Sequence, residues 1–412
     1  MRHETDGAGI ADAELPVSGR NVSGESLVAE TLRLVLTTAN YNYIKDGVAL
    51  TLNRLVAWLG QHDVEVMVVA PQAKTPAFVH EGRLEAVRSF PIPFRGEYRI
   101  GLPIGPNLAA KIRAFNPHLF HIASPEFTGH SALRLARDME RPVVASYHTR
   151  FDTYLQYYHL DFLRAALNRS ERALYDNCEH LYVPSFSMMD ELRAAGMAGD
   201  NMRLWARGVD HERFTPAKRS RDWRQAHGIA DDDVLIAYAG RLVAEKNMAL
   251  MSRVFSALDA KPGPQRTILL GDGPEAGWMR KAMPNTVFAG FLHGDDLATA
   301  YASSDIFFFP SISETFGNVT LEAMASGLPA VTADAAGSRS LVREGETGFL
   351  VDASREDIMI DRLTQLVADP QMRSRFGARA RDVALAEYDW DKIFSGLLAD
   401  YREAVAGFRT RG

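Results

Sequence analysis

The chain has 412 residues, of which 46% are hydrophobic and 24% charged, and these proportions exclude a disordered or fibrous protein. Lysine and arginine total 46 against 52 aspartates and glutamates, so the net charge of −6 excludes a chain-wide basic surface for nucleic acid. The single cysteine, Cys178, excludes an intramolecular disulfide and a multi-cysteine metal site, which favours a reducing compartment, and we expect it to be buried.

The N-terminal segment is rich in glycine and acidic side chains and contains almost no large apolar ones. It lacks the apolar core of a secretion signal, so we predict a disordered tail over residues 1–30. No run elsewhere approaches the roughly 18 apolar residues that a membrane-spanning helix needs. The longest candidates, such as Asp305–Pro310, have the length of a strand. These features predict a cytoplasmic protein.

From residue 32 onward, short runs of Val, Ile, Leu and Phe alternate with longer segments of helical periodicity, the pattern of βαβ units with parallel sheets. The runs are Leu32–Ala39, Val64–Ala70, His118–Ala123, Pro142–Tyr147 and Leu181–Pro184, then Val234–Gly240, Thr267–Gly271, Thr286–Ala289, Asp305–Pro310, Pro329–Thr332 and Gly348–Val351. At roughly 150 residues per domain, the length suits two such domains. We predict two doubly wound, Rossmann-like α/β domains facing a cleft that binds ligands.

The polar, irregular stretch Trp205–Pro216 separates the two sets of runs. We therefore predict an N-terminal domain over residues 31–206 and a C-terminal domain over residues 207–385. The last segment, 386–412, has apolar side chains at helical spacings of three and four. It is predicted to be a helix, which could cross back to the first domain.

Two polar features follow strands of the first domain. After the first strand, Lys45-Asp46-Gly47 opens an amphipathic helix, and Gly47 would let the backbone approach a phosphate, although an ordinary loop glycine would look the same. His148 ends the fourth strand and is either a site residue or a hydrogen-bonded core histidine. His121, on the preceding strand, is predicted to be a core histidine.

Aromatic residues and then arginines follow His148. Aromatic side chains with polar tips beside cations suit the surface of an anionic membrane, where each basic residue contributes about 1 kcal/mol. Ordinary helix packing produces the same mixture, so both interpretations stay open. The residues are Phe151, Tyr154, Tyr157, Tyr158, Phe162, Arg164, Arg169 and Arg172.

The first strand of the second domain leads into Gly240, Arg241 and Lys246. Ligands bind at the carboxyl ends of strands in such folds, so both cations are expected at the site. A guanidinium and an ammonium together can neutralise a diphosphate. A pair of surface charges is the alternative.

The second strand of this domain leads into Gly271-Asp272-Gly273-Pro274, which lacks the third glycine of a dinucleotide fingerprint. A nicotinamide cofactor is therefore not indicated, and a tight turn between strand and helix would explain the run. The chain also contains no G-x-x-x-x-G-K loop, no G-x-S-x-G elbow and no H-E-x-x-H helix.

The segment Pro310–Pro329 is the most informative, because it reads as a strand, a loop and a helix that begins near Phe316 and ends at Gly327. Backbone N–H groups at that helix start can bind a phosphate. Glu314 before the helix and Glu322 on it can accept hydrogen bonds from sugar hydroxyls. Either carboxylate alone would be an ordinary helix residue; their combination favours a sugar-phosphate site. The amides concerned belong to Phe316, Gly317, Asn318 and Val319.

With seven residues between Glu314 and Glu322, the sequence resembles the retaining GT-B glycosyltransferases of glycosyltransferase family 4, and the resemblance extends from Leu32 to about Tyr401. It implies that Glu314 contacts the hydroxyls of the transferred sugar and Glu322 the ribose of the nucleotide. It also implies that Arg241 and Lys246 bind the diphosphate and stabilise it as it leaves, so the predicted catalytic residues are Arg241, Lys246, Glu314 and His148. The remaining implied contacts to the sugar nucleotide come from Gly47, His148, Gly240, Asp272, Gly273 and the amides of Phe316, Gly317, Asn318 and Val319.

Family members often carry two adjacent glycines where this chain has Asp46-Gly47, which changes the fit of that loop to a phosphate. The Ser-Tyr-His-Thr run followed by paired tyrosines is similar to the lipid-modifying members, such as sulfoquinovosyl diacylglycerol synthases and glycolipid mannosyltransferases. This similarity implies a retaining hexosyltransferase that uses a UDP- or GDP-linked sugar, with no cofactor and no metal ion. The acceptor would be a membrane lipid or a glycan, bound by the first domain near Tyr154, Tyr157, Tyr158 and Arg164.

Two other classes of function stay open. A sugar-nucleotide epimerase of the same fold would use the same diphosphate site without an acceptor. A catalytically silent module would bind the sugar nucleotide without turnover. The membrane interpretation implies a peripheral location on the inner face of the plasma membrane.

Overall fold

The computed structural model describes residues 31–92, 95–148, 162, 164–197 and 199–411. The predicted tail over residues 1–30 and the tyrosines Tyr154, Tyr157 and Tyr158 lie outside these residues. From Leu32 onward, the described residues belong to one compact unit, which contains two parallel sheets. This is the predicted class of two doubly wound α/β sheets.

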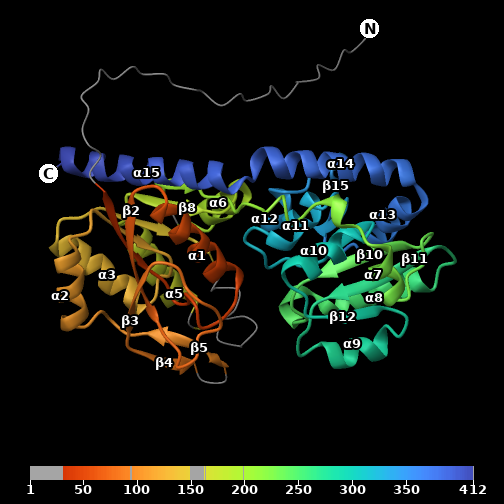
Figure 1. Ribbon diagram of the computed structural model, residues 1–412, viewed down its shortest axis with the longest axis horizontal. Helices are drawn as coiled ribbons and strands as arrows, with labels where there is room; N and C mark the ends of the chain where they lie inside the picture. The colour runs from red at the N-terminus through yellow and green to blue at the C-terminus, as the bar shows by residue number, and fades with distance from the viewer. Residues whose placement is uncertain (1–30, 93–94, 149–161, 163, 198, 412) are drawn as a thin grey trace, which may run out of the picture. The chain divides into compact units, whose positions relative to one another are not determined.

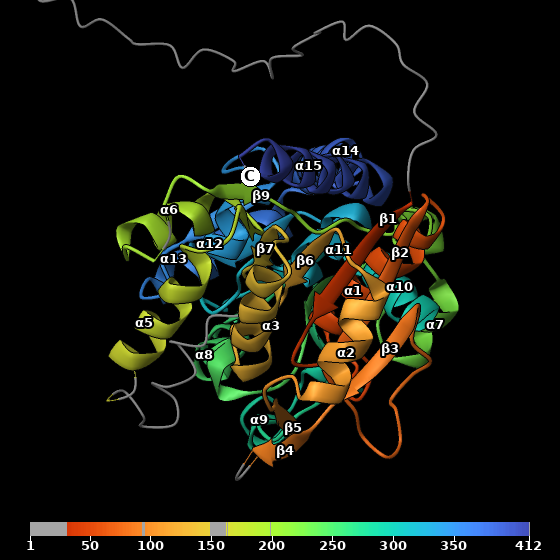
Figure 2. The same ribbon diagram turned by 90° about the vertical axis from the view of Figure 1, so that its left-hand side faces the viewer.

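The first sheet has seven parallel strands in the order β3-β2-β1-β6-β7-β8-β9 (Figure 2). Its central strands are almost wholly buried because helices cover both faces of such a sheet. The strands are β1 (Leu32–Thr37), β2 (Val64–Pro71), β3 (Arg83–Val87), β6 (Leu119–Ile122), β7 (Val143–Ser146), β8 (His180–Val183) and β9 (Met202–Leu204). The helices between them are α1 (Gly47–Gly60), α2 (Pro106–Phe115), α3 (Phe127–Asp138), α5 (Arg164–Tyr175) and α6 (Phe186–Ala194).

The five runs predicted for this sheet all form strands, but four further strands were not predicted. The edge strand β3 is partly exposed and contains polar residues, and the edge strand β9 has only three residues, so neither has the apolar run of a buried strand. The antiparallel pair β4 (Ser89–Ile92) and β5 (Arg95–Gly101) forms a separate two-stranded sheet. Polar and edge strands lack the pattern that identifies central ones.

The second sheet has six parallel strands in the order β12-β11-β10-β13-β14-β15. All six were predicted, to within about two residues at their ends. They are β10 (Val234–Ala239), β11 (Gln265–Leu270), β12 (Val287–Gly290), β13 (Ile306–Phe309), β14 (Ala330–Ala333) and β15 (Gly348–Val351). The helical elements are η2 (Pro216–Lys218), α7 (Arg221–Ala226), η3 (Ala244–Lys246), α8 (Met248–Asp259), α9 (Ala276–Ala282), α10 (Gly294–Ala302), α11 (Asn318–Ala325), α12 (Ala336–Arg339), α13 (Glu356–Ala368) and α14 (Pro370–Glu387).

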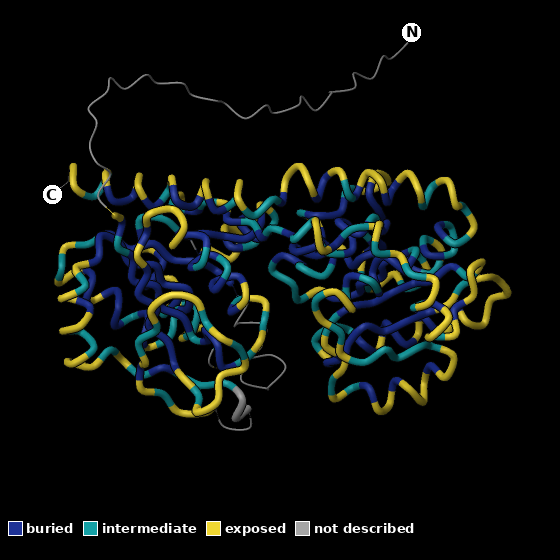
Figure 3. Tube along the Cα trace, in the orientation of Figure 1, coloured by how far each residue is buried: buried dark blue, intermediate teal, exposed yellow. Residues whose placement is uncertain are grey.

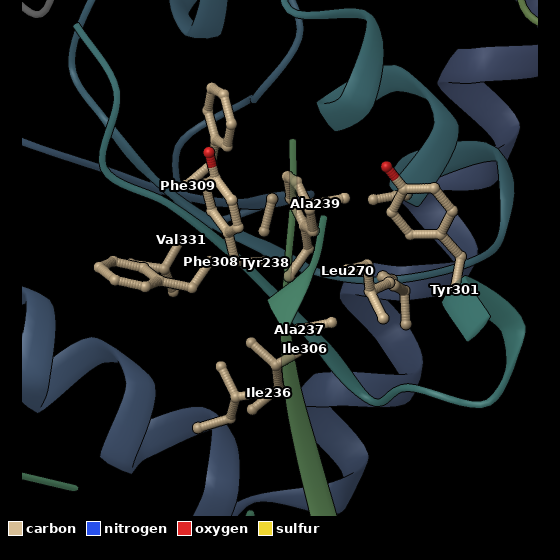
Figure 4. Close-up of a cluster of buried hydrophobic side chains, with 14 of the residues drawn as sticks. Ile236, Ala237, Tyr238, Ala239, Leu270, Tyr301, Ile306, Phe308, Phe309 and Val331 are labelled. Atoms are coloured by element: carbon tan, nitrogen blue, oxygen red, sulfur yellow. The ribbon is translucent and has the colours of Figure 1, made fainter. Parts of the chain in front are cut away.

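The core of the second sheet is aromatic around β10 and β13 (Figure 4). The rings of Tyr238 and Phe309 stack with their centroids 5.6 Å apart, and Phe307 stacks on Phe309 at 5.8 Å. All three side chains are at most 1% exposed. Close packing of this kind makes the carboxyl ends of β10 and β13 a rigid base for the loops that follow them.

The C-terminal helix α15 (Trp390–Arg411) packs against α1, and its inner face is buried with the core of the first sheet (Figures 1 and 3). The indole N–H of Trp58 donates to Asp391 at 2.8 Å. Arg203 on β9 forms ion pairs with Asp400 at 2.6 Å and Glu403 at 2.7 Å. The last helix of the chain thus completes the half of the molecule that the first strand begins.

We call β1–β9 with their helices and α15 the first half, and β10–β15 with their helices the second half. The connecting segment between β9 and β10 contains Trp205 and Arg207, both at most 6% exposed. Its backbone contacts both sides, because Trp205 N–H donates to Val183 of β8 and Val209 N–H donates to Tyr388 after α14. The lone cysteine, Cys178, is 7% exposed as expected, and burial raises the pKa of its thiol to about 12.

Candidate active site

The loops after β10 and β11 are held together backbone to backbone, and this contact explains their glycines. A Cβ atom at Gly271 would overlap the carbonyl of Gly240, and one at Gly273 would overlap the carbonyl of Leu242. The N–H of Leu242 donates to the carbonyl of Asp272 at 3.0 Å. Close packing alone therefore explains the glycines of this run. The loop after β11 supports the segment that carries Arg241 and Lys246.

Lys246 joins the loop after β10 to the loop after β13. Its ammonium forms an ion pair with Glu314 and donates to Ser313 Oγ at 3.3 Å. Ser313 Oγ donates in turn to the carbonyl of Glu245 at 3.1 Å. The side chains of Lys246 and Glu314 are 22% and 23% exposed, so both remain accessible to a ligand. The structure thus brings together two residues that are 68 positions apart.

Arg241 lies on the same loop and is exposed. Its carbonyl accepts a hydrogen bond from the Tyr238 hydroxyl at 3.0 Å, which fixes the backbone of the residue. Within the described part of the chain, no carboxylate forms an ion pair with the guanidinium of Arg241. The charge of Arg241 also acts on Asp46 of the first half. Burial raises the pKa of the Asp46 carboxyl, while hydrogen bonds from Ala49 and Asn40 and the charge of Arg241 lower it.

Helix α11 begins at Asn318, two residues later than predicted. Gly317 precedes it in the left-handed region at φ 97°, a conformation that disfavours other residues. Phe316 lies in the loop, where its side chain is 4% exposed and packs against the ring of Tyr388 at 5.7 Å. Among the described residues, no acceptor takes the N–H groups of Gly317, Asn318 or Val319. These three amides are available to an anion.

Gly47 of the first half lies against this helix start. A Cβ atom at Gly47 would be 3.1 Å from the side-chain nitrogen Nδ2 of Asn318, so a larger residue would press on the Asn318 side chain. Asp46 caps α1 by accepting from the N–H of Ala49 at 2.8 Å. The N-terminal ends of α1 and α11, which both carry partial positive charge, therefore approach the same point.

Glu322 lies on α11 and accepts a hydrogen bond from the Tyr301 hydroxyl at 3.3 Å. Burial raises its pKa to about 7, while the hydrogen bond from Tyr301 and the charge of Arg213 lower it. The two glutamates of the motif therefore differ: Glu314 is neutralised by an ammonium, whereas Glu322 is held by a hydroxyl in an apolar surrounding.

His148 follows β7 and is in contact with the second half through its backbone. Its carbonyl accepts from Thr315 Oγ1 at 3.2 Å, and Thr315 is the residue after Glu314. Its ring is 9% exposed; one ring nitrogen lies 2.7 Å from Ser146 Oγ and the other contacts Arg207. Burial, then Arg207, holds the pKa of His148 well below its ordinary value. The backbone of His148 thus lies at the candidate site, while its ring is hydrogen-bonded as a core histidine would be.

Two contributors to the site were not predicted. A Cβ atom at Gly337 on α12 would lie 2.8 Å from Cβ of Glu314 and 3.0 Å from its carbonyl, so only glycine leaves room for this loop. In the sequence, Gly337 is only a glycine shortly after a strand, and many loops share this feature. Arg207 lies in the segment that the sequence marks as a polar boundary, and it contacts the ring of His148.

Of the four residues predicted for the acceptor side, the structure describes one. Tyr154, Tyr157 and Tyr158 lie outside the described residues, and Arg164 is the first residue of α5. No helix in the described ranges combines the length and apolarity needed to cross a membrane. The same ranges contain no group of three or more His, Cys, Asp or Glu side chains that could hold a metal ion.

The comparisons with known proteins agree with the geometry. Residues 45–213 match the family model described as Glycosyltransferase Family 4, and residues 219–383 match the model described as Glycosyl transferases group 1. The sulfoquinovosyl transferase of Arabidopsis thaliana is 33% identical over 367 residues, covering 87% of this chain and 71% of that protein. The GDP-mannose-dependent alpha-mannosyltransferase of Corynebacterium glutamicum is 30% identical over 383 residues, covering 92% of this chain and 91% of that protein.

Among solved structures, the sucrose-phosphate synthase of Thermosynechococcus elongatus superposes with a TM-score of 0.74 at 19% identity, covering 91% of this chain and 100% of that one. This likeness shows the fold, two Rossmann-like halves in the GT-B arrangement. The sequence relatives show the family. The chain therefore belongs to glycosyltransferase family 4 and is a retaining glycosyltransferase that uses a nucleotide sugar.

Proposed function

We propose that the protein transfers a hexosyl unit from a UDP- or GDP-linked sugar to a hydroxyl group of a membrane lipid or glycolipid, forming an α-glycosidic bond. The observation that carries the sugar-nucleotide part is the meeting of Lys246, Glu314 and the free amides of α11 at the ends of β10 and β13. The observation that favours a lipid acceptor is an exposed aromatic and basic surface on α5 and α6.

The diphosphate would bind to two cations and the start of α11. The ammonium of Lys246 has three N–H groups, and two already donate to Glu314 and Ser313, so the third is free for a phosphate oxygen. The exposed guanidinium of Arg241 can add a bidentate contact. As the sugar leaves, negative charge grows on the terminal phosphate, and these groups stabilise it without a metal ion or cofactor.

The two glutamates would bind hydroxyl groups of the same molecule. Ionised carboxylates only accept hydrogen bonds, and sugar hydroxyls donate them. Glu314 gives one oxygen to Lys246 and keeps the other for the transferred sugar. Glu322, next to Tyr301 on a helix that packs against β13 and β14, would accept from the ribose.

Chemistry would proceed on one face of the sugar, as retention of configuration requires. The bond from the anomeric carbon to the phosphate oxygen breaks, and a bond from the same carbon to the acceptor oxygen forms. The proton of the acceptor hydroxyl passes to the departing phosphate, which acts as the base. No carboxylate nucleophile is needed in this scheme, and Glu314 and Glu322 have the binding roles given above.

The acceptor surface consists of apolar and basic side chains on two neighbouring helices. Phe162 before α5 is 76% exposed, and Phe186 at the start of α6 is 66% exposed. Arg169 and Arg172 on α5 are exposed, and Arg172 donates to the carbonyl of Gly196 after α6, which ties the two helices together. Exposed phenylalanines beside arginines suit an anionic lipid surface.

A second candidate acceptor is a glycan. It is favoured by the 30% identity, over 91% of its length, to a GDP-mannose-dependent alpha-mannosyltransferase. In this case GDP-mannose would be the substrate and a mannose-containing glycan the product.

A two-step experiment tests the proposal. Thermal shift with a panel of UDP- and GDP-linked sugars identifies the nucleotide sugar, because a ligand of the folded state raises its apparent stability. The selected sugar, radiolabelled, is then incubated with a lipid extract, with soluble glycans and without acceptor. Label in the lipid fraction is expected; label only in glycans supports the second candidate, and an epimer formed without acceptor would show an epimerase instead.

A further inference from the structure

The described residues include two deeply buried arginines, Arg207 and Arg224, and their surroundings differ. Arg224 is 2% exposed, and its guanidinium donates to Asp305 at 3.2 Å and to the carbonyls of Ser303, Ala230 and Asp233 at 2.7 to 2.8 Å. A buried cation with a carboxylate partner and several acceptors is an ordinary structural feature. Arg224 therefore stabilises the fold of the second half.

Arg207 is 6% exposed, but within the described ranges no carboxylate pairs with it. It donates to the carbonyl of Trp205 at 3.0 Å and to the ring of His148, and its guanidinium lies over the Trp205 ring at 4.7 Å. Burying a cation without a counter-ion costs free energy. Stability of the fold alone thus gives no reason for an arginine here.

The contact of Arg207 defines where the ring proton of His148 lies. An arginine can only donate, so Nδ1 of His148 must accept and its Nε2 must carry the proton. Nε2 of His148 then donates to Ser146 Oγ at 2.7 Å, and Ser146 Oγ lies 2.8 Å from Nε2 of His121.

Nδ1 of His121 lies 2.6 Å from the Tyr401 hydroxyl on α15. The contact with Arg207 thus makes His148 neutral with its proton on Nε2, while His121 is compatible with either tautomer because the hydroxyls of Ser146 and Tyr401 both donate and accept. Burial lowers the pKa of His121 to about 3, and burial with the charge of Arg207 lowers that of His148. The titratable groups that act on His148 among the described residues are Arg207 and His121.

The position of His148 matters because its carbonyl holds the loop that carries Glu314. Thr315 Oγ1 donates to that carbonyl at 3.2 Å, and the carbonyl of Thr315 accepts from Ser185 Oγ at 3.4 Å. The residue next to Glu314 is therefore anchored to two strand ends of the first half. If the His148 ring could rotate, the hydrogen bond from Thr315 to the His148 carbonyl would be weakened.

We propose that Arg207 is a positioning residue for glycosyl transfer: it fixes His148 in one tautomer and one orientation, and through the His148 carbonyl it fixes Thr315 and Glu314. The inference rests on the sugar-nucleotide site proposed above and does not depend on the acceptor. Arg207 thereby has a function that explains an unpaired buried charge.

Three variants separate this role from a structural one. Arg207→Met removes the charge and both donors, Arg207→Lys keeps the charge and can still donate to Nδ1, and Arg224→Met is the matched control. We expect Arg207→Met to lower kcat by roughly 10- to 100-fold through misplacement of Glu314, with a small change in KM for the nucleotide sugar. Arg224→Met should lower the Tm more than Arg207→Met does, because Asp305 and three carbonyls each lose a hydrogen bond from the guanidinium.

The pH profile adds a readout that a structural role would not change. Without the charge of Arg207, the pKa of His148 should rise, although burial still lowers it, so the activity of Arg207→Met should fall in the acidic range as His148 becomes protonated. Wild type and Arg207→Lys should show no such fall from His148. An unchanged kcat and pH profile in Arg207→Met would overturn the proposal.

The tautomers can be measured in the wild-type protein without any substrate. In 15N NMR spectra of the histidine rings, the proton of His148 is expected on Nε2. A proton on Nδ1 of His148 would overturn the proposal even if the variants fail to fold. Because this measurement needs no sugar, it distinguishes failure of the inference from failure of the proposed function.

Discussion

The two halves of the molecule present their site residues in different ways. In the second half, Lys246, Glu314 and the amides of α11 follow directly from the ends of strands whose aromatic core is closely packed. In the first half, Gly47 and His148 contribute mainly backbone, and the ring of His148 is turned into the core. We therefore propose a division of labour: the second half would supply the charges that bind the sugar nucleotide, and the first half would limit their positions and present the proposed acceptor surface.

Among the tests of this division of labour, we expect the largest effect from removal of the Lys246 ammonium in the second half. Lys246→Ala removes the ammonium that contacts Glu314, so transfer should fall by roughly 100- to 1000-fold, the size of a lost charge-stabilising donor. Steady-state turnover measures the effect, and circular dichroism checks that the fold is kept. Lys261→Ala is the matched control, since Lys261 is exposed and bonds only to Thr364 at 3.2 Å among the described residues. Equal turnover in the two variants would remove Lys246 from the site.

Glu322 allows a test by pH. With its pKa raised to about 7, the carboxyl is half protonated near neutrality, so affinity for the nucleotide sugar should weaken as the pH falls through 7, if the ribose needs the ionised form. The effect on the stability of the fold has the opposite sign. Because the pKa of Glu322 in the folded protein lies above the ordinary 4.5, its ionisation lowers the free energy of unfolding. This destabilisation is absent below about pH 4.5 and complete above about pH 7.

Glu322→Gln should therefore bind the nucleotide sugar roughly 10-fold more weakly at pH 8, as expected for one lost charged hydrogen bond, while having a higher Tm than wild type at that pH. The Tm advantage should shrink toward pH 5. Calorimetric titration and thermal melts at both pH values measure the two effects. A variant that is destabilised at pH 8 would show that Glu322 serves the fold and not the ligand.

A substitution at Gly47 tests whether the first half restricts the position of Asn318 by close packing. Gly47→Ala places a Cβ atom 3.1 Å from Asn318, so turnover should fall by a few-fold, while the better helix propensity of alanine keeps the stability of α1. Gly60→Ala at the other end of α1 is the control, because nothing lies within 4 Å of its added Cβ atom. If both variants keep wild-type turnover, the first half does not constrain Asn318 at this point.

The smallest expected effect concerns the acceptor surface. Replacing Phe162 and Phe186 by serine should reduce sedimentation with anionic vesicles by a few-fold and leave binding of the nucleotide sugar unchanged. Phe291→Ser, which removes a phenylalanine that is 69% exposed in the second half, is the control. Wild-type protein that binds neither anionic nor neutral vesicles would contradict a lipid surface on α5 and α6.

Local patterns in the sequence predicted much of the second half, because its strands are apolar runs and its charges follow them within a few residues. Prediction failed where the cause is not local. The edge strands β3 and β9 are polar or short, and α11 starts only after Gly317, whose left-handed conformation is not helical. The contact of Arg207 with His148 spans 59 residues, so only the folded chain reveals it.

Calorimetric titration with UDP and GDP, without sugar or acceptor, tests the central claim most directly. Wild type should bind one of the two nucleotides, and Arg241→Gln with Lys246→Ala should lose that binding while keeping its fold, because the diphosphate would have lost both cations. Unchanged affinity in the double variant would show that the diphosphate binds elsewhere, and it would contradict the division of labour between the two halves.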